Sequence, residues 1–123
     1  MKYALVAVTL LACMLAACNA SVPSRMTVSD TKKRRVDTEP GTSLSAQRYA
    51  CADGMLNVSP VTEATDIDAR VVATGDPVII EVDAVLKNFG SFGHDQPVTY
   101  HCEYLGGSLT ASRWVRGITQ GSK

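Results

Sequence analysis

The chain has 123 residues, of which 46% are hydrophobic, and its 12 basic and 12 acidic side chains give a formal net charge of zero. This length leaves room for one domain, and the composition excludes collagen-like fibres and proteins dominated by an acidic or basic tail. The charge is unevenly distributed: residues 1–41 carry six basic and three acidic side chains, a net charge of +3, whereas residues 42–123 carry six and nine, a net charge of −3.

The N-terminus is typical of an exported protein. The uncharged stretch Ala4–Ala17 is too short to cross a bilayer as a helix, but it fits the apolar part of a secretory signal peptide. Leu15-Ala16-Ala17-Cys18 resembles the lipobox of bacterial lipoproteins. The resemblance implies removal of residues 1–17, attachment of diacylglycerol to the Cys18 thiol, and a fatty acid such as palmitate on the freed amine. By the same resemblance, Asn19 implies sorting to the outer membrane, where an Asp would favour the inner membrane.

Two other interpretations of this region remain. The first is an ordinary cleaved signal peptide in which Cys18 is incidental. The second is a lipobox at Leu10-Leu11-Ala12-Cys13, which would leave a very short apolar run and a bulky Leu11 where a small residue is preferred. We expect lipidation at Cys18, and therefore a protein tethered to the membrane with its head in the periplasm.

Residues 18–42 are rich in Ser, Thr, Pro and charged residues and have few large apolar side chains. Such a segment buries too little surface to offset the entropy of ordering it, so we expect a flexible basic linker. The run Lys32–Arg35 either contacts anionic lipid or another acidic envelope polymer, or is a solvated patch within the linker.

The head, residues 43–123, retains Cys51 and Cys102. In an oxidising compartment two thiols in a small domain most simply form one disulfide. A zinc site would instead need both cysteines to converge with His94 and His101. Adjacent strand residues such as His101 and Cys102 point to opposite faces, which argues against that convergence. We predict no metal ion and no cofactor.

A helix is expected over residues 43–56, with Ser43 as its N-cap and with Leu44, Cys51 and Met55 on one apolar stripe. Polar residues interrupt this stripe, and Gly54 weakens the last turn.

Beyond the helix, alternating apolar and polar residues predict two β-hairpins. In the first, Ile67–Ala73 and Val78–Leu86 are joined at Gly75-Asp76, which pairs Val71 with Ile80.

The second hairpin turns at Gly106-Gly107. Its predicted pairs are Tyr104 with Leu109, Cys102 with Ala111, and Val98 with Val115. The two hairpins predict a four-stranded antiparallel sheet covered by the helix, an α+β fold with one disulfide.

Two regions are candidates for binding a partner. The connection Lys87–Pro97 holds Phe89, Phe92 and His94 among glycines, and it is either a binding loop or a link whose Phe residues close the core. The pair His94-Asp95 could also act as an acid and a base.

On the last strand, the predicted register makes Trp114 and Arg116 face away from the helix. They form either a protein contact or a cover for the second sheet face.

A short fragment, Tyr49-Ala50-Cys51-Ala52-Asp53-Gly54, is similar to the opening of the membrane-bound inhibitors of c-type lysozyme. In that family the Cys starts a strand, which differs from the helix expected here, and the Ser-rich inhibitory loop has no counterpart in this chain. We expect a noncatalytic outer-membrane lipoprotein that binds or scaffolds another envelope protein, without nucleic acid. The alternative is a periplasmic inhibitor of a lysozyme-like hydrolase.

Overall fold

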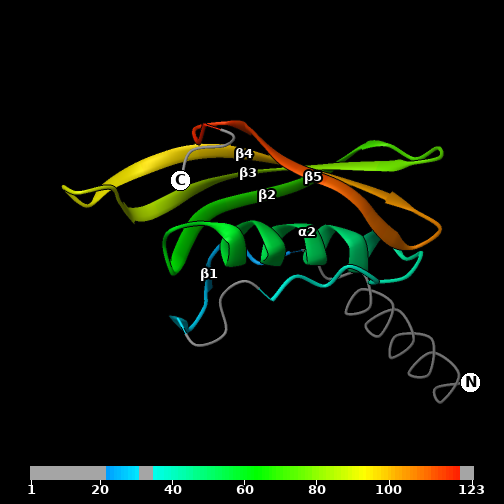
Figure 1. Ribbon diagram of the computed structural model, residues 1–123, viewed down its shortest axis with the longest axis horizontal. Coiled ribbons are helices and arrows are strands. Elements are labelled where there is room, and N and C mark those ends of the chain that lie inside the picture. Colours follow the sequence, from blue (N-terminus) through cyan, green and yellow to red (C-terminus); the bar gives the residue numbers. More distant parts are fainter. Residues whose placement is uncertain (1–21, 31–34, 120–123) are drawn as a thin grey trace, which may run out of the picture.

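The structure, a computed structural model, describes residues 22–30 and 35–119. One helix packs on a five-stranded antiparallel sheet whose strand order is β1-β2-β3-β4-β5 (Figure 1). The elements are β1 (Met26–Thr27), α2 (Leu44–Val58), β2 (Glu63–Ala73), β3 (Val78–Phe89), β4 (His94–Leu105) and β5 (Ser108–Arg116). The predicted α+β class and the helix-on-sheet arrangement are confirmed, but the sheet has five strands and not four.

The additional strand comes from the segment expected to be a flexible linker. In β1, Met26 pairs with Ala64 of β2 and is 8% exposed. Next to this pair, the amide of Ile67 donates to the carbonyl of Ser24 at 3.1 Å. The buried Met26, the half-buried Val22 and Val28, and a few backbone hydrogen bonds hold this segment against the sheet. These apolar residues are scattered among polar ones, so the average composition of the segment did not reveal the strand.

The same segment continues across the helix to the opposite edge of the sheet. Val36 Cγ1 lies 3.4 Å from where a Cβ on Gly54 of α2 would be. Further on, the carbonyl of Thr38 accepts from the amide of Leu109 at 2.7 Å. Residues 22–30 and 35–42 therefore form a strap that runs from β2 over α2 to the start of β5, with its cyan part passing along the outer side of the helix in Figure 1. We call these residues the strap.

Because the strap covers its outer side, α2 is buried almost all round. Its N-cap is Ser43, as predicted, and the Ser43 side chain accepts from the amide of Ala46 at 3.3 Å. Of the predicted stripe, Cys51 and Met55 are buried, but Leu44 is 39% exposed, so that part of the prediction was wrong. Gln47 is buried instead and donates to the carbonyl of Gly41 in the strap at 2.8 Å.

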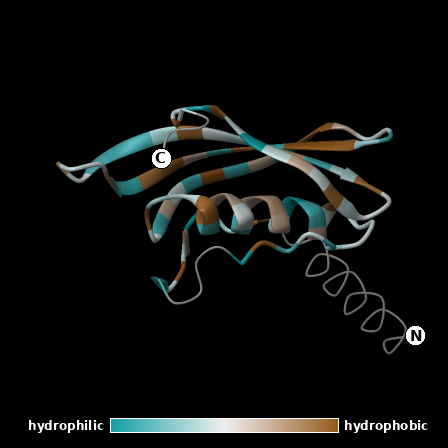
Figure 2. Ribbon diagram, viewed as in Figure 1, coloured by the Kyte–Doolittle hydropathy of each residue, from teal (hydrophilic) through white to brown (hydrophobic). Residues whose placement is uncertain are grey.

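Apolar and polar residues alternate along the strands (Figure 2). The middle of the first hairpin has the predicted register, with Val71 opposite Ile80, but the register shifts before the turn, where Ala73 lies opposite Ile79. The second hairpin begins as predicted, with Tyr104 opposite Leu109, and then shifts by one residue between Glu103 and Tyr104. An extra residue in one strand moves every following side chain to the other face.

Beyond this bulge Cys102 lies opposite Ser112 and not Ala111, and Tyr100 lies opposite Trp114. The prediction that Trp114 faces away from the helix was therefore wrong. A second shift, between Thr99 and Tyr100, places Arg116 opposite Thr99 on the outer face, as expected.

The core lies between α2 and the inner face of the sheet, and the predicted disulfide crosses it. Cys51 of α2 bonds to Cys102 of β4, with Cα atoms 6.0 Å apart. Nearby, Tyr104 is 2% exposed, and burial raises the pKa of its phenol. A disulfide that closes a loop of 51 residues stabilises a fold by about 4 kcal/mol in the chain-entropy model.

Candidate functional site

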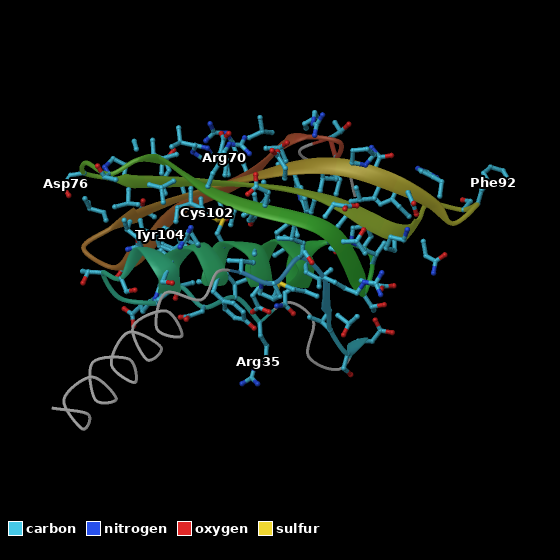
Figure 3. All side chains as sticks on the ribbon, turned by 180° about the vertical axis from the view of Figure 1, so that it is seen from behind. Arg35, Arg70, Asp76, Phe92, Cys102 and Tyr104 are labelled. Carbon is cyan, nitrogen blue, oxygen red and sulfur yellow. A yellow bond between two sulfur atoms is a disulfide. The ribbon has the colours of Figure 1, made fainter. Side chains whose placement is uncertain are left out.

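The β3–β4 hairpin extends beyond both of its neighbouring strands. On one side, β2 stops pairing with β3 at Leu86. On the other side, the Gln96 side chain donates to the carbonyl of Gly117, just beyond the end of β5. We call residues 87–95 the projecting hairpin. Figure 1 shows it as the yellow loop that reaches past the sheet, and Figure 3 shows Phe92 at its far end.

The tip of the projecting hairpin has a defined backbone shape. The amide of Gly93 donates to the carbonyl of Gly90 at 3.2 Å, which closes the turn. Asn88, Gly90 and Gly93 have φ angles of 57°, 77° and 64°, in the left-handed region that Gly and Asn tolerate best. A Cβ on Gly90 would lie 3.1 Å from Cε1 of His94, so the ring of His94 also restricts this position.

The two Phe residues of the hairpin occupy different environments. Phe89 is half-buried against the core, and its ring meets the His94 ring edge to face at a centroid distance of 5.5 Å. Phe92 is 96% exposed. The interpretation in which both Phe residues close the core therefore holds for Phe89 and not for Phe92. Phe92 is the large hydrophobic side chain that the hairpin presents to solvent.

The polar groups at the base of the projecting hairpin pair with different neighbours. Lys87 Nζ donates to Asp95 Oδ2 at 2.8 Å across the two strands. His94 Nε2 lies 3.1 Å from Oε1 of Gln96. The adjacent residues His94 and Asp95 are therefore engaged separately, and the structure does not assemble them into an acid–base pair.

The other two candidate residues lie apart from this hairpin. Trp114 packs against Tyr100 on the helix side of the sheet, with ring centroids 4.8 Å apart. Arg116 lies on the outer face opposite Thr99. Thr99 is five residues along β4 from His94, or about 17 Å at the usual rise of a strand. The sequence candidates therefore do not form one surface.

The outer face of the sheet carries an ion-pair network that the sequence reasoning missed. Arg70 of β2 contacts both Asp83 and Glu81 of β3, the latter at 3.2 Å. Glu81 also contacts Nδ1 of His101 at 3.0 Å, and Nε2 of His101 lies 2.8 Å from Glu103. The predicted pairing of Val71 with Ile80 already placed Arg70 beside Glu81, so the signal was present in the first hairpin.

Asp83 belongs to this network, and its surroundings shift its pKa. Desolvation by burial is the largest single influence and raises the pKa of Asp83. Hydrogen bonds from Thr99 and Arg70, together with the nearby charges of Arg70 and Arg116, outweigh it and lower the pKa overall. The Thr99 hydroxyl donates to Asp83 Oδ1 at 2.6 Å. The network thus favours the charged carboxylate at neutral pH. Arg113 of β5 lies 3.7 Å from Glu103, so the network links four strands.

A shallow pocket lies between the strap and the second half of α2. Its lining residues are Thr27, Val28, Ser29, Arg35, Asp53 and Asn57. Burial raises the pKa of Asp53, opposed by a hydrogen bond with Asn57. Ser29 and Arg35 flank residues 31–34, which lie outside the described part of the chain, so we assign no ligand to this pocket.

Within residues 22–30 and 35–119, no group of three or more His, Cys, Asp or Glu side chains is arranged to hold a metal ion. No helix in these ranges is long and apolar enough to cross a membrane. The predicted signal peptide, the lipidation residue Cys18 and most of the basic run Lys32–Arg35 lie outside the described residues. Of that run, Arg35 is described and points away from the body of the protein (Figure 3).

Comparison of the chain with protein-family models, curated proteins and solved structures gives no match. The fragment Tyr49–Gly54, which resembles the lysozyme inhibitors, lies inside α2. Cys51 is thus in a helix, as the composition predicted, and not at the start of a strand, as the resemblance implies. The candidate site is therefore assigned from geometry alone.

Proposed function

We propose that this protein is a noncatalytic lipoprotein of the bacterial outer membrane whose periplasmic head binds another envelope protein through the projecting hairpin. The observation that carries the proposal is the side chain of Phe92, which is 96% exposed at the tip of that hairpin. The other Phe of the hairpin, Phe89, packs against the core and so has a structural role. Phe92 has no such contact with the core, which leaves its ring available to a partner.

The physical argument rests on what such a side chain gains in a partner. Moving a Phe side chain from water into an apolar pocket is worth about 1.5–3 kcal/mol. Aromatic residues that fill a pocket on the partner are frequent binding hot spots. The hydrogen-bonded turn between Gly90 and Gly93 restricts the loop before binding, which reduces the entropy lost on association.

The lipid anchor can be tested independently of the partner. In the wild-type protein we expect a diacylglycerol-modified Cys18, detected by mass spectrometry, and a precursor that accumulates when the lipoprotein signal peptidase is inhibited with globomycin. Cys18→Ser should abolish both the modification and membrane fractionation. If wild-type protein matures without added lipid mass, the anchor assignment is wrong, and Cys18 belongs to an ordinary signal peptide.

Photo-crosslinking in living cells tests the binding site. A photoreactive amino acid in place of Phe92 should form a discrete crosslinked product with one envelope protein. The matched control is the same photoreactive residue at Leu105, which is 50% exposed at the β4–β5 turn. Equal products from both positions, or none from either, would contradict binding through the hairpin.

A hydrolase inhibitor remains the second candidate. A two-stranded projection with an aromatic tip has a shape that can enter an active-site cleft, and the fragment Tyr49–Gly54 resembles known lysozyme inhibitors. The test adds the purified protein to c-type lysozyme and follows lysis of cell walls. Inhibition that Phe92→Ala removes would favour this candidate, whereas unchanged lysis at micromolar protein would exclude it.

A further inference from the structure

The strap changes how far the head can lie from a lipid anchor. If residues 18–42 were all a free linker, the head would begin at Ser43, 25 residues after Cys18. The structure instead places residues of this segment on the body of the protein from Val22 onward. Val22 and Val28 both pack against the core, and Met26 between them is 8% exposed.

Hydrogen bonds fix this early part of the strap to β2 and to the loop before it. The carbonyl of Ser24 accepts from the amide of Ile67 at 3.1 Å, and the amide of Val28 donates to the carbonyl of Thr62 at 2.8 Å. Arg25 adds an ion pair with Glu63 at 3.6 Å, although this pair is largely exposed. Residues 19–21 separate Cys18 from Val22, the first residue that the structure describes.

Chain geometry converts this count into a distance. Four residue steps from Cys18 to Val22 span at most about 14 Å, whereas 25 steps to Ser43 would span about 85 Å. The strap therefore uses up most of the length that the sequence alone assigns to a tether.

We propose that the head is held directly against the membrane surface, with its β1 edge and strap toward the lipid headgroups. This inference rests on the proposed lipid anchor at Cys18. The described strap carries two exposed bases, Arg25 and Arg35, and three exposed acids, Asp30, Asp37 and Glu39, so the inference rests on the tether length and not on charge.

The short tether also limits which partner the projecting hairpin can reach. Asp83 lies opposite Asp68, close to the attachment of Ser24 to Ile67, and Phe92 is nine residues further along the chain. Those nine residues span about 30 Å. With the tether and the path of about 20 Å from Val22 to Asp83, Phe92 lies within about 65 Å of the Cα atom of Cys18. Any partner of the hairpin therefore binds it within this distance of the anchored residue.

Neutron reflectometry of the acylated full-length protein on a supported bilayer of phosphatidylethanolamine and phosphatidylglycerol measures this arrangement. The expected result is a protein layer whose near side lies within about 15 Å of the headgroups. An acylated protein separated from the headgroups by a water layer several times thicker overturns the inference and leaves the anchor intact. A protein that carries no acyl mass overturns the anchor, and the inference with it.

Two variants establish that the strap sets the distance. Met26→Asp places a charge at a buried position of β1, whereas Thr27→Asp places it at an exposed neighbour. The water layer should widen in Met26→Asp and stay unchanged in Thr27→Asp. Insertion of twenty Gly and Ser residues after Asn19 should widen the water layer without changing the fold. This variant decides the question even if Met26→Asp misfolds. An unchanged layer after the insertion would contradict the short tether.

Discussion

The two faces of β4 differ in what they contribute to the protein. The inner face carries Tyr100, Cys102 and Tyr104, all at most 4% exposed and packed beneath α2. The outer face carries Thr99, His101 and Glu103 in the ion-pair network, and α2 lies on the other side of the sheet (Figure 1). Apolar burial and a disulfide stabilise the first face, whereas the pairs on the second are partly solvated and individually weak. Stability should therefore depend strongly on the inner face and little on the outer one.

Removing the disulfide of the inner face should cause the largest loss of stability. Replacing Cys51 and Cys102 together with Ser should lower the free energy of unfolding by about 4 kcal/mol, because the unfolded chain regains the entropy of an open loop. Urea titration followed by circular dichroism measures the change. Wild-type protein unfolded in the presence of a reductant is the control, and a loss below 1 kcal/mol in both would show that the disulfide does not stabilise the inner face.

A cavity under the helix should have the next largest effect. Leu56 of α2 is fully buried, and Leu56→Ala should cost about 3 kcal/mol of unfolding free energy, since it removes apolar contacts and leaves a void. Leu44→Ala changes an exposed Leu of the same helix and should cost less than about 0.5 kcal/mol. Equal losses from the two variants would mean that α2 is not packed between the sheet and the strap.

Disrupting the contact between the strap and the β4–β5 turn should have a smaller effect on stability. Two glycines of this turn, Gly106 and Gly107, supply a variant and its matched control. Gly106 and Gly107 have φ angles of 58° and 84°, so Ala is strained at both. Only at Gly107 would the new Cβ collide with the strap, 2.9 Å from the carbonyl carbon of Gly41. Gly107→Ala should therefore cost at least about 1 kcal/mol more than Gly106→Ala in thermal or urea unfolding. Indistinguishable variants would argue against a strap seated on this turn.

Substitutions on the outer face should cause the smallest loss of stability, and this loss should depend on pH. The lowered pKa of Asp83 means that its carboxylate stabilises the fold above the unfolded-state pKa of about 3.9. That contribution is lost as pH falls through the lower, folded-state pKa. Asp83→Asn should thus lower stability by less than about 1 kcal/mol at pH 7 and by nothing in acid, because the group is partly solvated. Urea midpoints measured across pH would contradict this account if the deficit persisted or grew in acid.

Local patterns were sufficient to predict part of the inner face. The N-cap Ser43, the first hairpin and the Cys51–Cys102 disulfide each follow from short spacings and simple pairing. The strap was missed because scattered side chains such as Met26 and Val36 gain their burial only from the finished helix and sheet. These are tertiary contacts that local composition does not record.

The candidate residues show the same limit. The single-residue bulge in β5 turned Trp114 to the inner face, and nothing in the sequence marks its position. Phe89 and Phe92 both stand beside glycines and could not be distinguished until the register of the hairpin placed one at its base and the other at its tip.

The central claim is that binding resides in the projecting hairpin, separately from the groups that stabilise the fold. A photoreactive residue at the exposed position Ser91 tests it most directly, in cells that carry either Phe92 or Phe92→Ala. The account predicts a crosslinked envelope protein with Phe92, loss of that product with Phe92→Ala, and the same urea midpoint for both proteins. A product that survives Phe92→Ala, or one lost only because the variant unfolds, would contradict it.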